Sequence, residues 1–198
     1  MSVSKIDIAN MALTHLGMSG ITSLTQDNPS AIACNTFFIP ARDEVLGESK
    51  WPFAAVSESL VLTTETITGW DYCYLYPVNA AAVWDVYDES TTLTRGEQEF
   101  EVLFVPGTNR RIICTDLQYA IADYTYKQED TSLYSPKFVM AFSYRLAAAM
   151  AHTLTGSAEI GIQLSTVYSA LISEAKRISG SEKRKKPNQE SSYQNSRG

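Results

Sequence analysis

The chain has 198 residues and a net charge of −6, and 44% of its residues are hydrophobic and 11% aromatic. This apolar content excludes a chain that is disordered throughout, and it suffices for one sizeable core or two small subdomains that share one. Polar residues or proline interrupt the longest apolar stretches before the roughly 18 residues that a membrane span needs. We therefore expect no transmembrane helix, and the N-terminal MSVSKIDIANMALTHLG lacks the pattern of a signal peptide.

The first predicted helix follows a clear start signal. Ser4 is its expected N-cap, and Asp7 stands three residues later, where it completes a capping box. Apolar residues then recur at helical spacing until Gly17, which is the expected terminator.

A second helix is predicted from Asn28 and Pro29, with the asparagine as cap and the proline at the first helical position. Its apolar pattern continues to Leu46. Pro40 lies inside this stretch and predicts a kink, because proline removes one backbone hydrogen bond and collides with the preceding turn. The charged run RDEVLGES at 42–49 is typical of the outer face of an amphipathic helix.

From about residue 58 to 127 the hydrophobic period shortens towards two, and β-branched and aromatic residues dominate. This change of period predicts an antiparallel sheet or a small sandwich. The turn PGTN at 106–109 has the glycine and asparagine of a tight hairpin. The predicted strands are 59–64, 72–76, 81–88, 100–105, 110–115 and 120–127.

Helical spacing returns after Ser135 and Pro136, stops at Gly156 and resumes from about Ala158 to Ile178. Two helices, a run of strands and two more helices predict an α+β protein: an antiparallel four-helix bundle with an inserted antiparallel β-sheet or sandwich subdomain and an extended C-terminal tail. The predicted domains are a helical bundle (1–57 and 130–178), an inserted β subdomain (58–129) and a flexible basic tail (179–198).

Charge is distributed unevenly along the chain. Residues 181–198 carry a local charge of +3, so the rest of the protein carries −9. The acidic remainder of the protein repels nucleic acid and membranes. The basic tail is therefore the segment that we expect to attract a partner by its charge. So polar a tail cannot bury enough surface to fold alone and is expected to become ordered on a partner.

The cysteines and histidines do not form a motif for catalysis or metal binding. Cys34, Cys73 and Cys114 are 39 and 41 residues apart, which is neither a redox nor a zinc spacing, and small core residues are expected. His15 and His152 lie near predicted helix ends without a carboxylate or cysteine at ligand spacing, and this position favours an interaction with the helix dipole. We expect no metal site and no cofactor.

Three neighbouring pairs of carboxylates deserve a test, because two acidic groups held close together can hydrolyse glycans. Their surroundings in the sequence are polar, which favours a solvated face or loop over a catalytic dyad. The pairs are Asp43 with Glu44, Glu97 with Glu99, and Glu129 with Asp130. No catalytic residue is assigned, and an enzyme is not expected.

Four segments resemble the head-to-tail adaptor, or connector, proteins of tailed bacteriophages, including the tail tubular protein A type of short-tailed phages. The matching features include the R-D-x-V-L run at 42–46 and the W-P-F at 51–53, and nearly the whole chain fits. The segments are IANMALTHLGMSGITSL (8–24), NPSAIACNTFFIPARDEVLGESKWPFA (28–54), YLYPVNAAAVWDVYD (74–88) and YTYKQEDTSLYSPKFVMAFSYRLAAAMAHTLTG (124–156).

This resemblance implies a structural virion protein that is made in the host cytoplasm and assembles in the virion neck. The implied partners are the portal protein, further copies in a ring of twelve on the portal, and a downstream tail or nozzle protein. Double-stranded DNA would pass without specific binding through a channel with an acidic wall, and no membrane is involved. Such an adaptor attaches after DNA packaging and takes part in genome ejection.

The tail is the element that the resemblance assigns to portal docking. Its basic cluster offers electrostatic contacts, and a proline and a tyrosine offer a rigid bend and an aromatic anchor. These residues are Lys183, Arg184, Lys185, Lys186, Pro187 and Tyr193. Three other functions stay open: a stopper or tail-completion neck protein, an adaptor with peptidoglycan hydrolase activity, and a nucleic-acid-binding protein that uses the tail.

Overall fold

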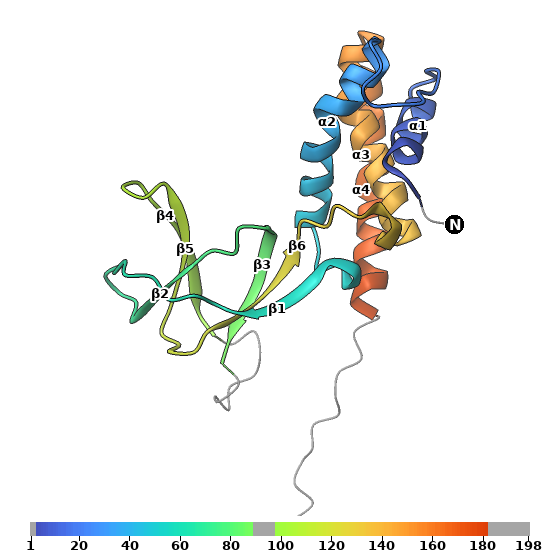
Figure 1. Cartoon of the computed structure of the whole chain (residues 1–198). Coiled ribbons are helices and arrows are strands. Elements are labelled where there is room, and N and C mark those ends of the chain that lie inside the picture. The colour runs from blue at the N-terminus through green and yellow to red at the C-terminus, as the bar shows by residue number, and fades with distance from the viewer. Residues whose placement is uncertain (1–2, 89–97, 182–198) are drawn as a thin grey trace, which may run out of the picture.

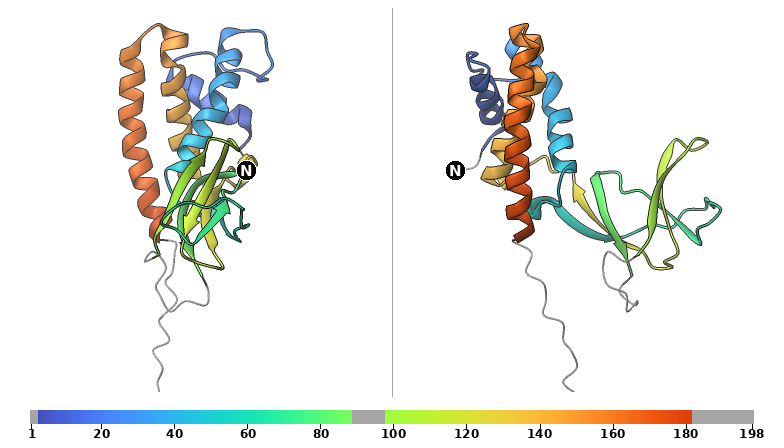
Figure 2. Two further views of the ribbon diagram at one scale, coloured as in Figure 1. Left: turned by 90° about the vertical axis from the view of Figure 1, so that its left-hand side faces the viewer. Right: turned by 180° about the vertical axis from the view of Figure 1, so that it is seen from behind.

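The computed structural model describes residues 3–88 and 98–181, which form an α+β protein with four α-helices and two small antiparallel sheets. The helices gather on one side, and the strands project away from one end of them (Figures 1 and 2). The helices are α1 (Lys5–His15), α2 (Pro29–Gly47), α3 (Pro136–Thr155) and α4 (Ala158–Ser181). The 3₁₀ turns Pro52–Ala54 and Thr131–Leu133 precede β1 and α3, respectively.

The predicted helix starts are confirmed by hydrogen bonds. The Ser4 hydroxyl accepts from the Asp7 N–H at 3.1 Å and the Asp7 carboxylate accepts from the Ser4 N–H at 2.9 Å, which is the expected capping box. At the starts of α2 and α3, the side chains of Asn28 and Ser135 accept from the Ala31 and Phe138 N–H groups, without the reciprocal bond of a capping box. Gly156 ends α3 with φ of 72°, a left-handed conformation that favours glycine.

Pro40 lies inside a helix that is continuous from Pro29 to Gly47. The carbonyl left without a donor by this proline belongs to Thr36, four residues earlier. Both residues are on the exposed side of α2, where water can satisfy the carbonyl. The position therefore tolerates a proline that the buried side would not.

Helix α3 is the centre of the helical part, because it packs against α1, α2 and α4. Its buried face includes Phe138, Phe142 and Leu146, and Ala147 and Ala151 let neighbouring helices come close. Beside α3, Trp51 is completely buried, with its ring 5.1 Å from that of Phe138. This apolar and aromatic cluster is the main core of the molecule.

The strands form two three-stranded antiparallel sheets, ordered β1-β6-β3 and β2-β5-β4. The first sheet lies beside the helices and the second lies further out (Figure 1). Buried residues of both sheets, among them Tyr74, Ile113, Val86 and Tyr124, share one hydrophobic cluster. The strands are β1 (Ala55–Ser59), β2 (Tyr72–Leu75), β3 (Ala80–Tyr87), β4 (Phe100–Val105), β5 (Arg110–Thr115) and β6 (Ile121–Tyr126).

The predicted strand at 59–64 is wrong in position. Strand β1 ends at Ser59, and beyond it Leu62 makes an isolated bridge with Tyr74. The apolar pattern was misleading because Val61 and Leu62 are 63% and 58% exposed, whereas β1 is mostly exposed and is held by backbone pairing with β6. Strand β1 also crosses the predicted domain boundary between residues 57 and 58.

Candidate interaction site

A pocket of about 530 Å³ opens where the end of β2, the turn between β4 and β5 and the end of β6 meet. Asn109 shapes this turn with φ of 52°, a conformation that asparagine tolerates better than most residues. Three cationic residues are among those that line the pocket, two from β5 and one just after β6. Its lining residues are Leu75, Tyr76, Val78, Ala80, Asn109, Arg110, Arg111 and Lys127.

The pocket combines positive charge with an apolar rim. The Arg111 guanidinium carbon lies 3.8 Å from the centre of the Tyr76 ring, and this stacking restrains the arginine. Arg110 is exposed beside it, and Val78 is 92% exposed at the rim. The Arg111 guanidinium can bind a carboxylate or phosphate through paired hydrogen bonds, so the pocket fits an acidic partner.

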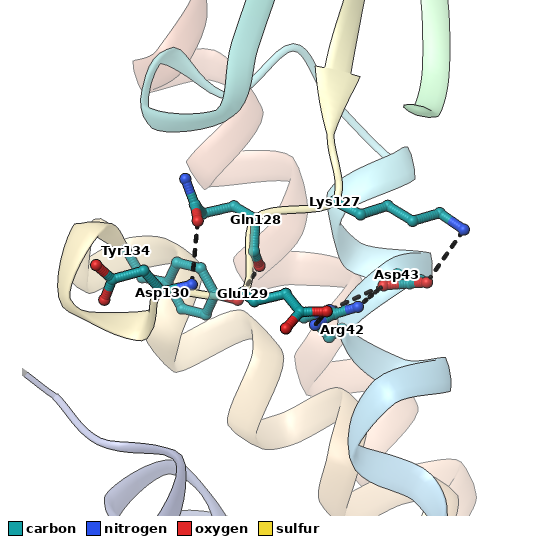
Figure 3. Close-up of polar contacts among 7 residues, drawn as sticks. All are labelled: Arg42, Asp43, Lys127, Gln128, Glu129, Asp130 and Tyr134. Carbon is teal, nitrogen blue, oxygen red and sulfur yellow. Dashed lines mark hydrogen bonds and ion pairs between the residues drawn. The ribbon is translucent and has the colours of Figure 1, made fainter. Parts of the chain in front are cut away.

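A polar network joins the pocket to helix α2 (Figure 3). The Arg42 side chain is 4% exposed, and its Nε and Nη2 lie 2.8 and 2.7 Å from one Asp43 oxygen. The other Asp43 oxygen is 3.4 Å from Lys127 Nζ, and Arg42 Nη1 is 3.8 Å from Glu129. Arg42 is therefore buried, contrary to the outer-face position expected for the 42–49 run.

The segment after β6 is held by its own contacts as well. The Tyr134 hydroxyl donates to the Gln128 carbonyl at 2.6 Å, and burial raises the pKa of Tyr134 to about 12. The Gln128 side chain accepts from the Asp130 N–H at 3.0 Å. Hydrogen bonds from Ser132 lower the pKa of the Asp130 carboxyl. These contacts stabilise the path of the chain from β6 to α3.

A second set of contacts ties the end of α2 to β6. Asp123 of β6 is 2% exposed and contacts both Lys50 Nζ and Ser57 Oγ. The Thr125 hydroxyl donates to the Ser49 carbonyl at 3.0 Å, and Trp84 Nε1 donates to the Thr125 oxygen at 2.7 Å. We call the two sets, which surround Arg42 and Asp123, the polar junction.

The structure gives the neighbouring carboxylates separate partners. Asp43 faces Arg42 and Lys127, whereas Glu44 lies 2.6 Å from Arg145. Glu129 approaches Arg42, whereas Asp130 caps a 3₁₀ turn. Glu97 lies outside the described residues, and the backbone oxygen of Glu99 accepts from Thr115 at 3.0 Å. Asp43, Glu44 and Glu129 thus take part in ion pairs, and Asp130 is a capping group.

The two histidines lie apart. His15 Nε2 is 3.1 Å from Ser143 Oγ, and the imidazole stacks on Tyr144 with ring centres 3.9 Å apart. His152 lies further along α3, about 13 Å from Ser143 along the helix axis. Within residues 3–88 and 98–181, no three histidine, cysteine or acidic side chains form a group that could hold a metal ion.

Acidification should destabilise the protein through His15. Burial lowers the pKa of His15 from 6.5, so below pH 6.5 the unfolded chain binds a proton that the folded state resists. Stability should therefore fall as the pH drops through and below 6.5. Urea unfolding at pH 7.5 and 5.5 should show a larger loss for the natural protein than for His15→Gln, and equal losses would contradict the assignment.

The six residues predicted to dock on the portal lie outside the described residues. They are Lys183, Arg184, Lys185, Lys186, Pro187 and Tyr193. The structure does extend α4 to Ser181, three residues beyond the helix end predicted at Ile178.

The basic pocket and the buried arginine were not singled out from the sequence, although each has a local signal. Two consecutive arginines, Arg110 and Arg111, follow the predicted PGTN turn directly. Arg42 is four residues after Phe38 and three before Val45, which places it on the apolar face of α2. The contact between Arg42 and Glu129 joins distant parts of the sequence and has no local signal.

The described part of the chain is thus an α+β protein with a basic pocket on its strands and a polar junction between strands and helices. No protein-family model matches the chain, and no curated protein matches it either. Within the described ranges, none of the helices is both long enough and apolar enough to cross a membrane.

Proposed function

We propose that this chain is a head-to-tail adaptor of a tailed bacteriophage, a structural protein that forms a ring of twelve on the portal. It joins the tail to the capsid after DNA packaging and forms part of the DNA channel. The proposal starts from the resemblance of segments 8–24, 28–54, 74–88 and 124–156. The structural observation that carries it is the presence of exposed apolar residues on both the helices and the projecting strands.

These apolar residues lie on two separate parts of the molecule. On α2, Ile32 and Ile39 are 55% and 56% exposed and are seven residues apart, which places them on one helix face. On the strand side, Val61 and Val78 are 63% and 92% exposed. A closed ring needs two different surfaces on each subunit that fit one another, and two apolar surfaces on different parts meet this need.

The finer architecture that we propose with this function is an antiparallel four-helix bundle with an inserted β sandwich. The packing of α3 against the other three helices supports the bundle. The hydrophobic cluster shared by the two sheets supports the sandwich. The extended C-terminal tail predicted over 179–198, of which α4 includes the first three residues, completes the proposed architecture.

The proposed partners follow from charge. The portal receives the basic tail, with Lys183 to Lys186 as its electrostatic contact and Tyr193 as its aromatic anchor. A downstream tail protein with acidic side chains fits the pocket that contains Arg110 and Arg111. The acidic remainder of the protein repels DNA, so a duplex can slide through the ring without being held.

Removing the tail should abolish binding to the portal. A variant that stops after Ser181 keeps all of α4, so its far-ultraviolet circular dichroism should match that of the full chain. We expect the full chain, but not this variant, to comigrate in sedimentation with the purified portal ring of the same virus. Unchanged comigration of the shortened chain would overturn the assignment of the tail.

Two tail variants separate charge from aromatic anchoring. Replacing Lys183, Arg184, Lys185 and Lys186 with alanine should weaken portal binding most at low salt, because screening already reduces the contribution of these charges at high salt. Tyr193→Ala should weaken it at all salt concentrations, and Ser191→Ala is the matched control. Binding of the full chain to a downstream tail protein, without binding to the portal, would favour a stopper or tail-completion protein instead.

A further inference from the structure

Cys73 of β2 and Cys114 of β5 lie directly opposite each other in the outer sheet. Their sulfur atoms are 3.0 Å apart, and both side chains are buried. Around them are Ile67, Trp70, Leu103, Val105 and Ile112. The proposed function uses neither cysteine, although together they form the one contact between thiols in the described part of the chain.

Backbone hydrogen bonds show which kind of strand pair these cysteines form. The Tyr76 N–H donates to the Arg111 carbonyl at 3.2 Å, so residues 76 and 111 are a hydrogen-bonded pair. In an antiparallel ladder such pairs alternate with non-hydrogen-bonded ones, which makes Cys73 and Cys114 a non-hydrogen-bonded pair. Consistently, the Cys73 carbonyl points away from β5 and accepts from the Thr63 N–H at 2.9 Å.

This kind of pair suits a disulfide. The Cα atoms of a non-hydrogen-bonded pair are about 4.5 Å apart, and the side chains are closer than in the alternating pair. Disulfides span Cα separations of about 4.4–6.8 Å, so no large backbone movement is needed to join the sulfurs. Cys34, by contrast, is buried in the helical core and belongs to a different cluster.

One loop covers the pair on the outer face of the sheet. Ile67 and Trp70 of this loop pack on the cysteines, and Trp70 Nε1 donates to Glu101 at 3.2 Å. Burial raises the pKa of Cys114 to about 12, so this cysteine stays a thiol in the closed sheet and reacts slowly. Opening of this loop, which covers the thiols together with Leu103 and Val105 of β4, gives a small oxidant a path to them.

We propose that Cys73 and Cys114 are a redox pair that closes into a disulfide when a small disulfide such as oxidised glutathione reaches it. One cysteine thiolate attacks a glutathione sulfur, which forms a mixed disulfide and releases one glutathione thiolate. The second cysteine thiolate then displaces the second glutathione. Two protein thiols become one disulfide, and the two electrons and two protons leave as two molecules of reduced glutathione.

The cross-link joins β2 to β5 and closes the loop that contains β3 and β4. It restricts the unfolded chain and should raise the thermal unfolding midpoint by roughly 5 to 15 °C. The disulfide persists in oxidising surroundings and is reduced again in the cytosol. This inference does not depend on the proposed function.

Intact-mass measurement and thiol alkylation test the proposal on the full chain. The reduced protein is incubated with oxidised glutathione, then denatured and alkylated with iodoacetamide. Before alkylation, we expect the mass of the oxidised protein to be lower than that of the reduced protein by two hydrogens. After alkylation, one cysteine, Cys34, should be alkylated in the oxidised protein, compared with three in the reduced protein. Cys34→Ala should still close the disulfide, whereas Cys73→Ser and Cys114→Ser should not.

Trp70→Ala is the control for a reaction that is slow because the thiols are buried, since it removes a side chain that packs on Cys73 and Cys114. Closure in either the natural protein or this variant supports the proposal. Three alkylated cysteines in both proteins, a stable glutathione adduct, or a disulfide between two chains would overturn it. The unfolding midpoint, measured with and without dithiothreitol, checks that the cross-link stabilises the folded protein.

Discussion

Trp51→Ala should lower the free energy of unfolding by about 3–5 kcal/mol, a large fraction of the roughly 5–15 kcal/mol that stabilises a typical domain. Trp51 is completely buried, and its ring meets Phe138 edge-on at 5.1 Å and Phe53 at 6.0 Å. Its indole N–H donates to the Val45 carbonyl at 3.0 Å. Alanine leaves a cavity at the place where α2, α3 and the start of β1 meet. Urea unfolding followed by circular dichroism measures the loss.

Two variants show whether the cavity causes this effect. Trp51→Phe keeps an aromatic ring, and the Val45 carbonyl still accepts from the Glu48 N–H at 3.3 Å, so the loss should be clearly smaller. Ile39→Ala removes a side chain that is 56% exposed and should change stability by less than about 0.5 kcal/mol. A similar loss for Trp51→Ala and Ile39→Ala would mean that the aromatic cluster is not the core of the molecule.

Lys50→Met should cost about 3–5 kcal/mol, because it removes the Lys50 ammonium group from the buried Asp123 carboxylate. Asp123 is 2% exposed, and the register between β3 and β6 places a second carboxylate, Asp85, opposite it. Without the lysine, desolvation and this neighbour both favour the protonated form of Asp123. Urea unfolding at pH 7 measures the loss.

The pH dependence of this loss identifies its cause. Protonation of Asp123 removes the charge that Lys50 balances, so the lysine matters less to stability as the pH falls through the range in which carboxyl groups titrate. The difference between the two proteins should therefore shrink between pH 7 and about pH 4. A difference that does not depend on pH would point to lost packing of the lysine side chain instead.

Lys137→Met is the matched control for this experiment. Lys137 pairs with Glu174 between α3 and α4, and the two side chains are 49% and 45% exposed. Water already solvates both groups, so the loss should be at most about 1 kcal/mol. The contrast between the two lysines tests whether burial, and not ion pairing as such, makes the polar junction important.

Helix ends and strand positions could be predicted from the sequence because their signals are local. Ser4 with Asp7, Asn28 with Pro29, and Gly156 each act within a few residues, and the structure confirms them. The position of β1 could not be predicted in this way. Its residues are mostly exposed, and its strand conformation depends on pairing with β6, more than sixty residues later.

The order of strands within each sheet had no signal either. Alternation of polar and apolar residues predicts a strand but does not name its neighbour, so neither β1-β6-β3 nor β2-β5-β4 could be derived. For the same reason the cysteines were interpreted singly, as small core residues. All three are buried, as predicted, but the contact between Cys73 and Cys114 depends on the register of β2 against β5.

The candidate sites differ in how far the sequence could identify them. The charge of the tail is visible in the sequence, and its residues from 182 onward lie outside the described structure. The basic pocket needs the fold, because Tyr76, Arg111 and Lys127 come from three strand ends. Arg42 was missed for a different reason: its place on the apolar face of α2 can be read from the sequence, but a charged residue in a helix was expected to face solvent.

The direct passage from β6 to α3 has a mechanical consequence. Strand β6 is the middle strand of the inner sheet, and α3 is the helix that contacts the other three. A pull on the strands therefore reaches the centre of the helical part through residues 127–135. The contacts of Arg42 and Tyr134 hold this short segment, so together with those of Asp123 and Thr125 they resist a force that pulls the two parts from each other.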